Sequence, residues 1–223
     1  MWTLLFDIDG TLIRTQGAGM GAIGQAVTKH YGLENIPQVN VHGCTDKGII
    51  TELFTKLKID LDADLSGFLH TYSELLQTAL KEREGEVLPG VIDVLEQLKA
   101  NPNVALGILT GNGKRAAEIK LDHFGLQEYF LFGGYGDNHS DRNDVAAQAS
   151  VAAAAFLGEQ FDATKVWVIG DTVNDIRCGR SIGAKVLAVE TGGDSPEILA
   201  SKDPDMQFSC LTNVSDWLVS LDS

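Results

Sequence analysis

The chain has 223 residues, 44% of them hydrophobic, and its 17 basic and 31 acidic side chains give a formal net charge of −14. This length and apolar content suit one mixed domain with a smaller subsidiary one, and they exclude a disordered chain or a collagen-like repeat. Because an acidic protein lacks the attraction that nucleic acids and anionic membranes exert on basic proteins, we expect neither as a partner.

Short apolar runs rich in Val, Ile and Leu alternate with longer segments of helical period. In chain order, strands are predicted at residues 3–6, 104–109, 129–132, 166–169 and 185–189, with a weaker sixth near 207–209. This alternation is typical of a parallel sheet covered by helices on both faces. The fold class is therefore predicted as α/β, with a Rossmann-like parallel sheet.

Almost a hundred residues separate the first two predicted strands, far more than one crossover helix needs. Apolar residues recur at helical spacing along 20–31, 49–57 and 65–80, which predicts three helices. Glycine-bearing stretches at 16–19 and 84–86 suit a hinge. We therefore expect a helical subdomain of residues 16–85, inserted into a core of residues 1–15 and 86–223.

Two carboxylates, Asp7 and Asp9, follow the first predicted strand and precede a turn at Gly10-Thr11. In α/β sheets, ligands bind at the carboxyl ends of the strands, so both acids lie where chemistry is expected. One of them can attack a substrate or hold a metal ion. The alternative interpretation is a polar turn with helix-capping acids.

A second acidic pair, Asp171 and Asp175, follows the predicted strand at 166–169. If a helix starts near Thr172, the two acids lie on the same side and can face a common point. Alternatively, they are an ordinary N-cap and a first-turn acid. Because four carboxylates at one sheet edge would repel one another without a cation, Mg²⁺ is implied as a cofactor.

The predicted strand at 104–109 leads into Thr110-Gly111-Asn112-Gly113-Lys114. A hydroxyl and glycine-flanked amides at a helix N-terminus form a cradle for anions, although Thr110 could simply cap the helix. Arg142, at a later predicted helix start, is the candidate cation, with a solvated surface arginine as the alternative. We therefore expect an anion site at Thr110, with Gly111, Asn112 and Lys114 as substrate-binding residues and Arg142 as the cation.

In the inserted segment, residues 41–48 form a glycine-flanked polar loop before a predicted helix. A substrate needs a polar or cationic contact on its non-reacting end, and Lys47 is the residue that we expect to supply it. The alternative is a plain helix start with Thr45 or Asp46 as the N-cap.

Four motifs together resemble the haloacid dehalogenase superfamily of Mg²⁺-dependent phosphohydrolases. They are DIDGT at 7–11, Thr-Gly at 110–111, a basic residue at 142 and GDTVND at 170–175. The inserted helices resemble the helical cap of phosphoglycolate phosphatase-like and β-phosphoglucomutase-like members. The resemblance implies that the first strand is central in the sheet, flanked by the strands that end at Thr110 and Asp171.

The resemblance also implies roles for the acids. Asp7 would attack phosphorus and form an aspartyl-phosphate, while Asp9 would protonate the leaving oxygen and later deprotonate water. The metal ligands would be Asp7, Asp9 through its backbone carbonyl, and Asp171, with Asp175 acting indirectly. Gly10 and Thr11 complete the first motif as substrate-binding residues.

The third motif departs from the family pattern, because the family most often has a lysine where this chain has Arg142. Lys114 and Lys120 lie earlier, on or beside the helix of the second motif. An arginine offers a bidentate fork where a lysine offers a point charge, so activity is compatible with the change. Whether Arg142 or Lys114 supplies the cation is open from the sequence.

The predicted function is a Mg²⁺-dependent phosphatase that acts on a small phosphorylated metabolite, either phosphoglycolate-like or a sugar phosphate. One alternative is a phosphomutase that returns the phosphoryl group to the sugar. Another is a non-catalytic phospho-receiver module, although such modules are smaller and lack the Asp-x-Asp pair.

Cysteine spacing and the N-terminus indicate the compartment. The three cysteines are an odd number at wide spacing without a C-x-x-C, which argues against a disulfide framework and a zinc site. The N-terminus lacks the basic region of a signal peptide, and no stretch approaches the ~20 apolar residues that a membrane span needs. We therefore expect the protein to lie in the reducing cytoplasm.

Overall fold

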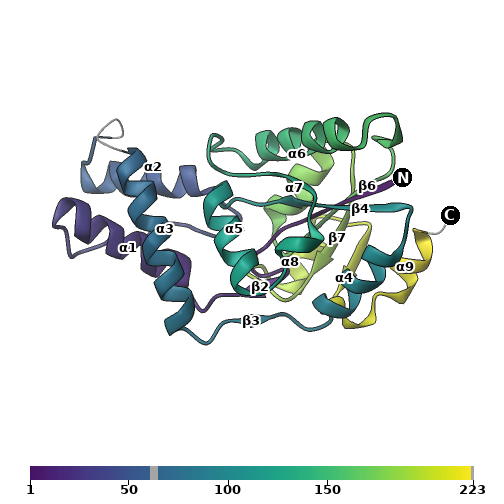
Figure 1. The fold of residues 1–223 in the computed structure, drawn as a ribbon, viewed down its shortest axis with the longest axis horizontal. Helices are drawn as coiled ribbons and strands as arrows, with labels where there is room; N and C mark the ends of the chain where they lie inside the picture. The colour runs from purple at the N-terminus through teal and green to yellow at the C-terminus, as the bar shows by residue number, and fades with distance from the viewer. Residues whose placement is uncertain (61–64, 222–223) are drawn as a thin grey trace.

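A parallel sheet of six strands runs through the protein (Figure 1), in a computed structural model that describes residues 1–60 and 65–221. Its strands are β1 (Trp2–Phe6), β4 (Val104–Leu109), β5 (Phe132–Gly134), β6 (Val166–Gly170), β7 (Lys185–Val189) and β8 (Met206–Phe208). The order is β5-β4-β1-β6-β7-β8, with every neighbouring pair parallel. The α/β class and the central place of the first strand are therefore confirmed.

The prediction for the third strand was wrong in its position. Residues Gln127–Tyr129 form a short 3₁₀ turn, and β5 begins only at Phe132. The first two residues of the apolar run are nevertheless buried: Tyr129 and Phe130 pack into the core, and the Tyr129 hydroxyl donates to a carboxylate oxygen of Glu96. Burial alone therefore made a turn resemble a strand.

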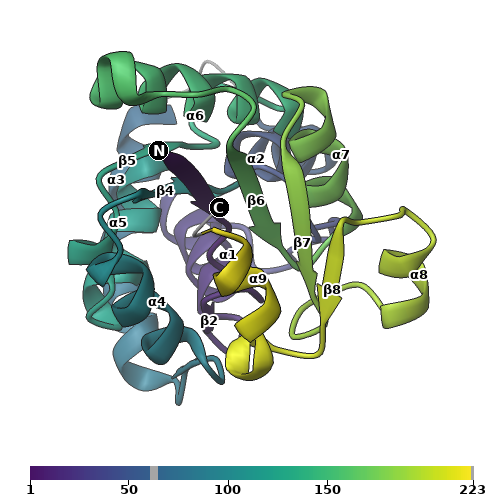
Figure 2. The ribbon, with the colours of Figure 1, turned by 90° about the vertical axis from the view of Figure 1, so that its right-hand side faces the viewer.

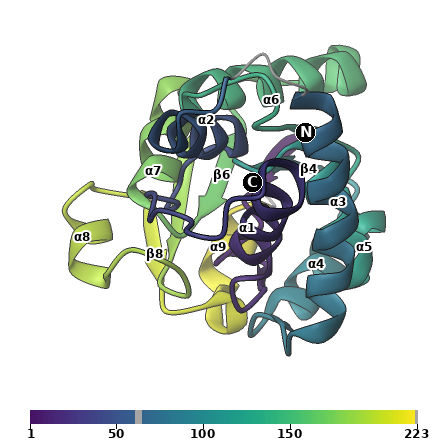
Figure 3. The ribbon, with the colours of Figure 1, turned by 90° about the vertical axis from the view of Figure 1, so that its left-hand side faces the viewer.

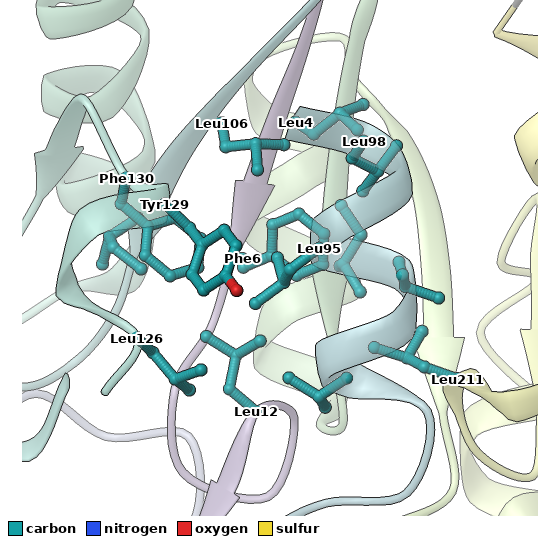
Figure 4. Packing of buried hydrophobic residues seen from close by; sticks show 14 of the residues in the cluster. Leu4, Phe6, Leu12, Leu95, Leu98, Leu106, Leu126, Tyr129, Phe130 and Leu211 are labelled. Atoms are coloured by element: carbon teal, nitrogen blue, oxygen red, sulfur yellow. The ribbon is translucent and has the colours of Figure 1, made fainter. Parts of the chain in front are cut away.

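Helices cover both faces of the sheet (Figure 2). On one face lie α4 (Val91–Ala100), α5 (Lys114–His123) and α9 (Ser215–Ser220), and on the other α6 (Arg142–Leu157) and α7 (Val173–Ser181). A shorter helix, α8 (Pro196–Ala200), packs through Leu199 near β7. Since side chains alternate along a strand, Leu4 and Phe6 of β1 face α4 (Figure 4), whereas Leu5 faces α6.

Trp217 of α9 closes the core on the α4 side. Its side chain is fully buried, and its ring lies edge-on to Phe6 and to Trp167, at centroid distances of 6.5 and 6.1 Å. A short helix near the end of the chain is thereby fixed to the central strands.

We expect Trp217→Ala to lower the free energy of unfolding by about 3–5 kcal/mol, because it removes a large buried side chain and leaves a cavity. Urea unfolding measures this loss. Val219→Ala on the same helix is the control, since Val219 is 69% exposed and its change should stay within about 0.5 kcal/mol. Equal effects of the two substitutions would show that α9 does not stabilise the core.

The inserted segment forms a helical cap over the carboxyl edge of the sheet (Figures 1 and 3). It contains α1 (Ala18–Tyr31), α2 (Asp46–Leu57) and α3 (Leu65–Glu82), which share an apolar cluster with Ala116 and Ile119 of α5. The predicted α-helical cap is thus confirmed as part of the fold. Its boundaries at residues 16 and 85 stay a prediction.

Two short strands join the cap to the core. β2 (Ile13–Arg14) and β3 (Glu86–Val87) pair antiparallel, so the chain leaves and re-enters the core side by side. Strands of two residues carry no period, and the sequence did not predict them. Among the residues that the structure describes, no helix is long and apolar enough to span a membrane.

Candidate active site

A cavity of about 480 Å³ lies between the carboxyl ends of the strands and the cap. The loops after β1, β4 and β6 line one side of it, with Asp7, Thr110 and Asp171 respectively. Segments far apart in the sequence thus meet at one edge of the sheet, as the motifs predict.

Three carboxylates form a compact buried group at the carboxyl ends of β1 and β6, and two of them, Asp7 and Asp171, line the cavity. Asp7, Asp171 and Asp175 each offer an oxygen within 4.8 Å of the others. Asp7 directly follows β1 and Asp171 directly follows β6, while Asp175 lies in the first turn of α7, where it forms a capping box with Thr172. Asp9, although predicted as a fourth member, is not part of this group.

Burial and neighbouring negative charge disfavour the ionisation of two carboxylates of this group, Asp7 and Asp171. Burial raises the pKa of Asp7 to about 7, against the opposing effect of Arg142. Burial and the charges of Asp175 and Asp7 also hold the pKa of Asp171 well above its usual range. A divalent cation relieves such repulsion, and carboxylate oxygens are the ligands that Mg²⁺ prefers. The donor set therefore fits Mg²⁺.

The turn after β1 fixes Asp171 in place. The hydroxyl of Thr11 donates to Oδ1 of Asp171 at 2.9 Å, and the backbone N–H of Gly193 donates to Oδ2 at 3.0 Å. Gly10 has a φ of +87°, and a Cβ there would lie 2.5 Å from a carboxylate oxygen of Asp171, so only glycine fits. Thr11 is buried and does not line the cavity, so its contact with the acid differs from the substrate contact that the sequence predicts.

Arg142 lies among these acids. It is the first residue of α6, is buried, and both terminal nitrogens of its guanidinium lie 3.3 Å from Oδ1 of Asp7. The same guanidinium donates to Oδ1 of Asp175, whose other oxygen accepts from the N–H and the hydroxyl of Thr172. Because both oxygens of Asp175 have partners, this acid holds Arg142 and the start of α7.

Asp9 forms a separate contact with Asn112, in the loop after β4, and with Lys120 of α5. Its Oδ2 accepts from Nζ of Lys120 at 2.6 Å and from Nδ2 of Asn112 at 2.7 Å. Lys120 also donates to Oδ1 of Asn112 at 2.6 Å. Among the hydrogen bonds of residues 1–60 and 65–221, only Oδ2 of the Asp9 carboxylate has a partner, so Oδ1 is free to act in the cavity.

The structure brings Lys120 into the cavity and leaves the predicted Lys114 outside it. Lys114 is exposed, and its backbone N–H donates to Asp137. Lys120 lies on the buried face of α5, three and four residues after Ala117 and Ala116. A lysine on the apolar face of an otherwise amphipathic helix is the sequence signal that could have found it.

Lys47 is also outside the cavity. Its Nζ donates to the backbone carbonyl of Asn138 at 2.9 Å, on the outer side of the cap–core junction. Successive residues of a helix point about 100° apart, so with Asp46 facing the cavity Lys47 turns away from it. The predicted substrate contact of Lys47 does not agree with this position.

The loop after β4, residues 110–113, contacts the cap. Thr110 is buried, and its hydroxyl accepts from the side-chain amide of Asn112 at 2.8 Å. Gly111 accepts the backbone N–H of Asp46 at 2.7 Å, and a Cβ on Gly111 would lie 2.0 Å from the carbonyl oxygen of Cys44. Thr110, Gly111 and Asn112 thus line the cavity together, at the point where the cap contacts the core.

The cap residues that line the cavity include Asp46 and Tyr72, which the sequence did not identify as site residues. Thr45 is the N-cap of α2, so Asp46 is its first helical residue. Oδ2 of Asp46 accepts the N–H of Gly113 at 2.8 Å, and burial raises the pKa of this carboxyl to about 6. Tyr72 of α3 lies beside it at the cavity wall.

Comparison with known proteins agrees with these observations. Residues 4–189 match the model of the haloacid dehalogenase-like hydrolase family. The chain is 28% identical over 199 residues to an N-acetylmuramic acid 6-phosphate phosphatase of Pseudomonas aeruginosa, covering 87% of this chain and 84% of that protein. It is 23% identical over 221 residues to a phosphoglycolate phosphatase of Vibrio vulnificus, covering 96% and 94%.

Solved structures show the same fold. CbbY from Rhodobacter sphaeroides, crystallised in complex with phosphate, superimposes with a TM-score of 0.76 at 16% identity. The match covers 96% of this chain and 97% of that one. A predicted phosphoglycolate phosphatase from Haemophilus somnus gives a TM-score of 0.70 at 19% identity, with 97% of both chains covered.

Proposed function

The chain belongs to the haloacid dehalogenase-like hydrolase family, and from this membership and the site we propose that it is a Mg²⁺-dependent phosphatase of small phosphate monoesters. We propose further that the reaction passes through an aspartyl-phosphate on Asp7. The observation that supports this most is the setting of Asp7, a buried carboxylate at the end of the central strand, between Arg142 and an open cavity.

Asp7 and Asp171, with the backbone carbonyl of Asp9, are the groups that would hold Mg²⁺. When bound, the ion neutralises charge between an anionic nucleophile and an anionic phosphate. Asp175 supports the site indirectly, since its oxygens are engaged by Arg142 and Thr172.

In the first step, a carboxylate oxygen of Asp7 attacks phosphorus while the bond to the leaving oxygen breaks, and Asp9 gives that oxygen a proton. In the second, Asp9 takes a proton from the water that attacks the aspartyl-phosphate, which releases inorganic phosphate and restores Asp7. Lys120 and Asn112 bind only Oδ2 of Asp9 and so direct Oδ1 to carry the proton. Thr110 and Arg142 hold phosphoryl oxygens.

A phosphomutase would use the same aspartyl-phosphate but return the phosphoryl group to a sugar. A phospho-receiver module would keep it, without turnover. Inorganic phosphate as the main product separates the phosphatase from both alternatives, because neither of them releases it on every cycle. A malachite-green assay of released phosphate with p-nitrophenyl phosphate is the direct test.

We also propose that the enzyme works in the cytoplasm on a small phosphorylated metabolite. Its three cysteines are free thiols, which suits a reducing compartment. The relatives named above as phosphatases have substrates of this size.

Removal of the metal ion is expected to stop turnover. With excess EDTA, hydrolysis of p-nitrophenyl phosphate should fall on the order of 10³-fold, since a metal ion contributes several kcal/mol of charge stabilisation in such reactions. Added Mg²⁺ should restore it. A thermal melt in EDTA controls for unfolding, and full activity in chelator would refute the metal assignment.

A further inference from the structure

The cavity extends well beyond the space that a phosphoryl group needs. Its volume of about 480 Å³ falls in the range of sites that enclose drug-sized ligands. The part that lies away from the acidic group is walled by the cap, through Gln16, Met20, Ile23, His42, Asp46 and Tyr72. This wall is where the leaving group of a phosphate ester would lie.

Two polar side chains of this wall are buried and have bonding capacity to spare. Asp46 is 9% exposed, and Tyr72 is 3% exposed. Among the hydrogen bonds of the described residues, Asp46 uses only Oδ2, for the N–H of Gly113, and the Tyr72 hydroxyl has no partner. Because Asp46 and Tyr72 both line the cavity, Oδ1 of Asp46 and the Tyr72 hydroxyl are available to bond to a ligand there.

The two groups are complementary in what they offer. Burial, followed by the charges of Asp46 and Asp9, holds the pKa of Tyr72 well above its usual range, so the phenol keeps its proton. Tyr72 therefore donates and Asp46 accepts. An alcohol O–H can accept from the first and donate to the second, whereas a carboxylate can only accept.

The cations around the cavity are already engaged. Arg142 pairs with Asp7 and Asp175, and Lys120 pairs with Asp9. Arg14 donates to Glu86 at 2.8 Å and to the carbonyl of Thr191 at 2.9 Å. Within the described part of the cap, no lysine or arginine lines the cavity. A second anionic group on a substrate would therefore meet the carboxylate of Asp46 without a free lysine or arginine of the cap to balance it.

We propose that the substrates are phosphate monoesters of uncharged, hydroxyl-bearing alcohols such as sugars and polyols, recognised by Asp46 and Tyr72, and that leaving groups with a carboxylate are rejected. This inference rests on the proposed phosphatase function. It selects one of the two substrate classes that the sequence left open. The cap contributes an acceptor and a donor for hydroxyls, and the negative charge of Asp46 repels a carboxylate.

Paired substrates that differ in one carboxylate test the proposal. The kcat/KM values are compared for glycerol 3-phosphate with 3-phosphoglycerate, and for sorbitol 6-phosphate with 6-phosphogluconate. We expect the uncharged member of each pair to be preferred at least about tenfold, as one unfavourable charge contact or lost hydrogen bond implies.

Two conservative variants test the residues. Asp46→Asn keeps an acceptor for Gly113 but loses the charge, so the preference should shrink about tenfold, with a gain for the carboxylate member. Tyr72→Phe should lower kcat/KM for sorbitol 6-phosphate about tenfold, and by a clearly smaller factor for p-nitrophenyl phosphate, whose leaving group has no alcohol hydroxyl to accept from Tyr72.

The matched controls are Asp137→Asn and Tyr135→Phe. Asp137 accepts the N–H of Lys114 at 2.7 Å, at the start of the same helix α5, but does not line this cavity. Tyr135 is a part-buried tyrosine that does not line the cavity either. Neither control should alter the preference.

The outcomes distinguish a failure of the phosphatase proposal from a failure of the substrate inference alone. If the wild-type enzyme releases no phosphate from any ester, including p-nitrophenyl phosphate, the phosphatase function itself is refuted. If it hydrolyses p-nitrophenyl phosphate but acts equally on both members of the pairs, prefers the carboxylates or ignores both, only the substrate inference is overturned. Equal effects of Asp46→Asn and Asp137→Asn overturn the role of Asp46.

Discussion

Asp7→Asn is expected to lower phosphate release on the order of 10⁴-fold or more, because an amide oxygen cannot replace the attacking carboxylate. The substitution is nearly isosteric. Since burial disfavours the charge of Asp7, the neutral side chain should leave the fold at least as stable. Steady-state release of inorganic phosphate and a thermal melt measure the two effects.

Asp9→Asn is the informative partner of that variant. It keeps the nucleophile but loses the proton carrier, so turnover should slow severely while Asp7 can still be phosphorylated slowly. Intact-mass spectrometry after incubation with substrate should then find a bound phosphoryl group in Asp9→Asn and none in Asp7→Asn. Near-normal rates in Asp7→Asn would refute the aspartyl-phosphate mechanism.

Arg142→Ala is expected to have the second-largest effect, and on two properties. Activity should fall on the order of 10²–10³-fold, as for the loss of one preorganised donor to a developing charge. Stability should also fall, by about 3–5 kcal/mol, because the buried carboxylates of Asp7 and Asp175 lose their partner. Phosphate release and urea unfolding, both in Mg²⁺, report these losses.

Two further variants separate charge from geometry. Arg142→Lys retains a cation and should recover most of the stability but only part of the activity, since a lysine lacks the fork that reaches two acids. Lys114→Ala should change activity by no more than about twofold, because Lys114 is exposed and outside the cavity. A larger loss in Lys114→Ala than in Arg142→Ala would move the cation role to Lys114.

The sequence predicted those parts of the fold and site that depend on local pattern. The strands β4 and β7 match the expected ranges, and Asp7 and Asp171 directly follow strands whose parallel order brings their ends together. The position of a residue at the end of a strand can be predicted without knowing how the helices pack. For this reason the acidic group could be expected, although the separation of Asp9 from it could not.

The remaining site residues depend on which face of a helix is buried and on which helices meet. Lys120 lines the cavity and Lys114 does not, because of how α5 packs, and the amino-acid composition does not specify this packing. Asp46 and Tyr72 come from different helices of the cap and meet only when α2 and α3 pack over the sheet edge. No spacing of residues in the sequence indicates that these two side chains lie close together.

The pairing of β2 with β3 has an evolutionary consequence. Ile13 lies opposite Val87 and Arg14 opposite Glu86, so the two chain connections between cap and core lie side by side at one place. Insertions, deletions or exchanges within the cap therefore leave the spacing of β1 and β4 unchanged. Selection can therefore change the cap wall of the cavity, and with it the proposed recognition of the alcohol, without disturbing the acids at the ends of β1 and β6.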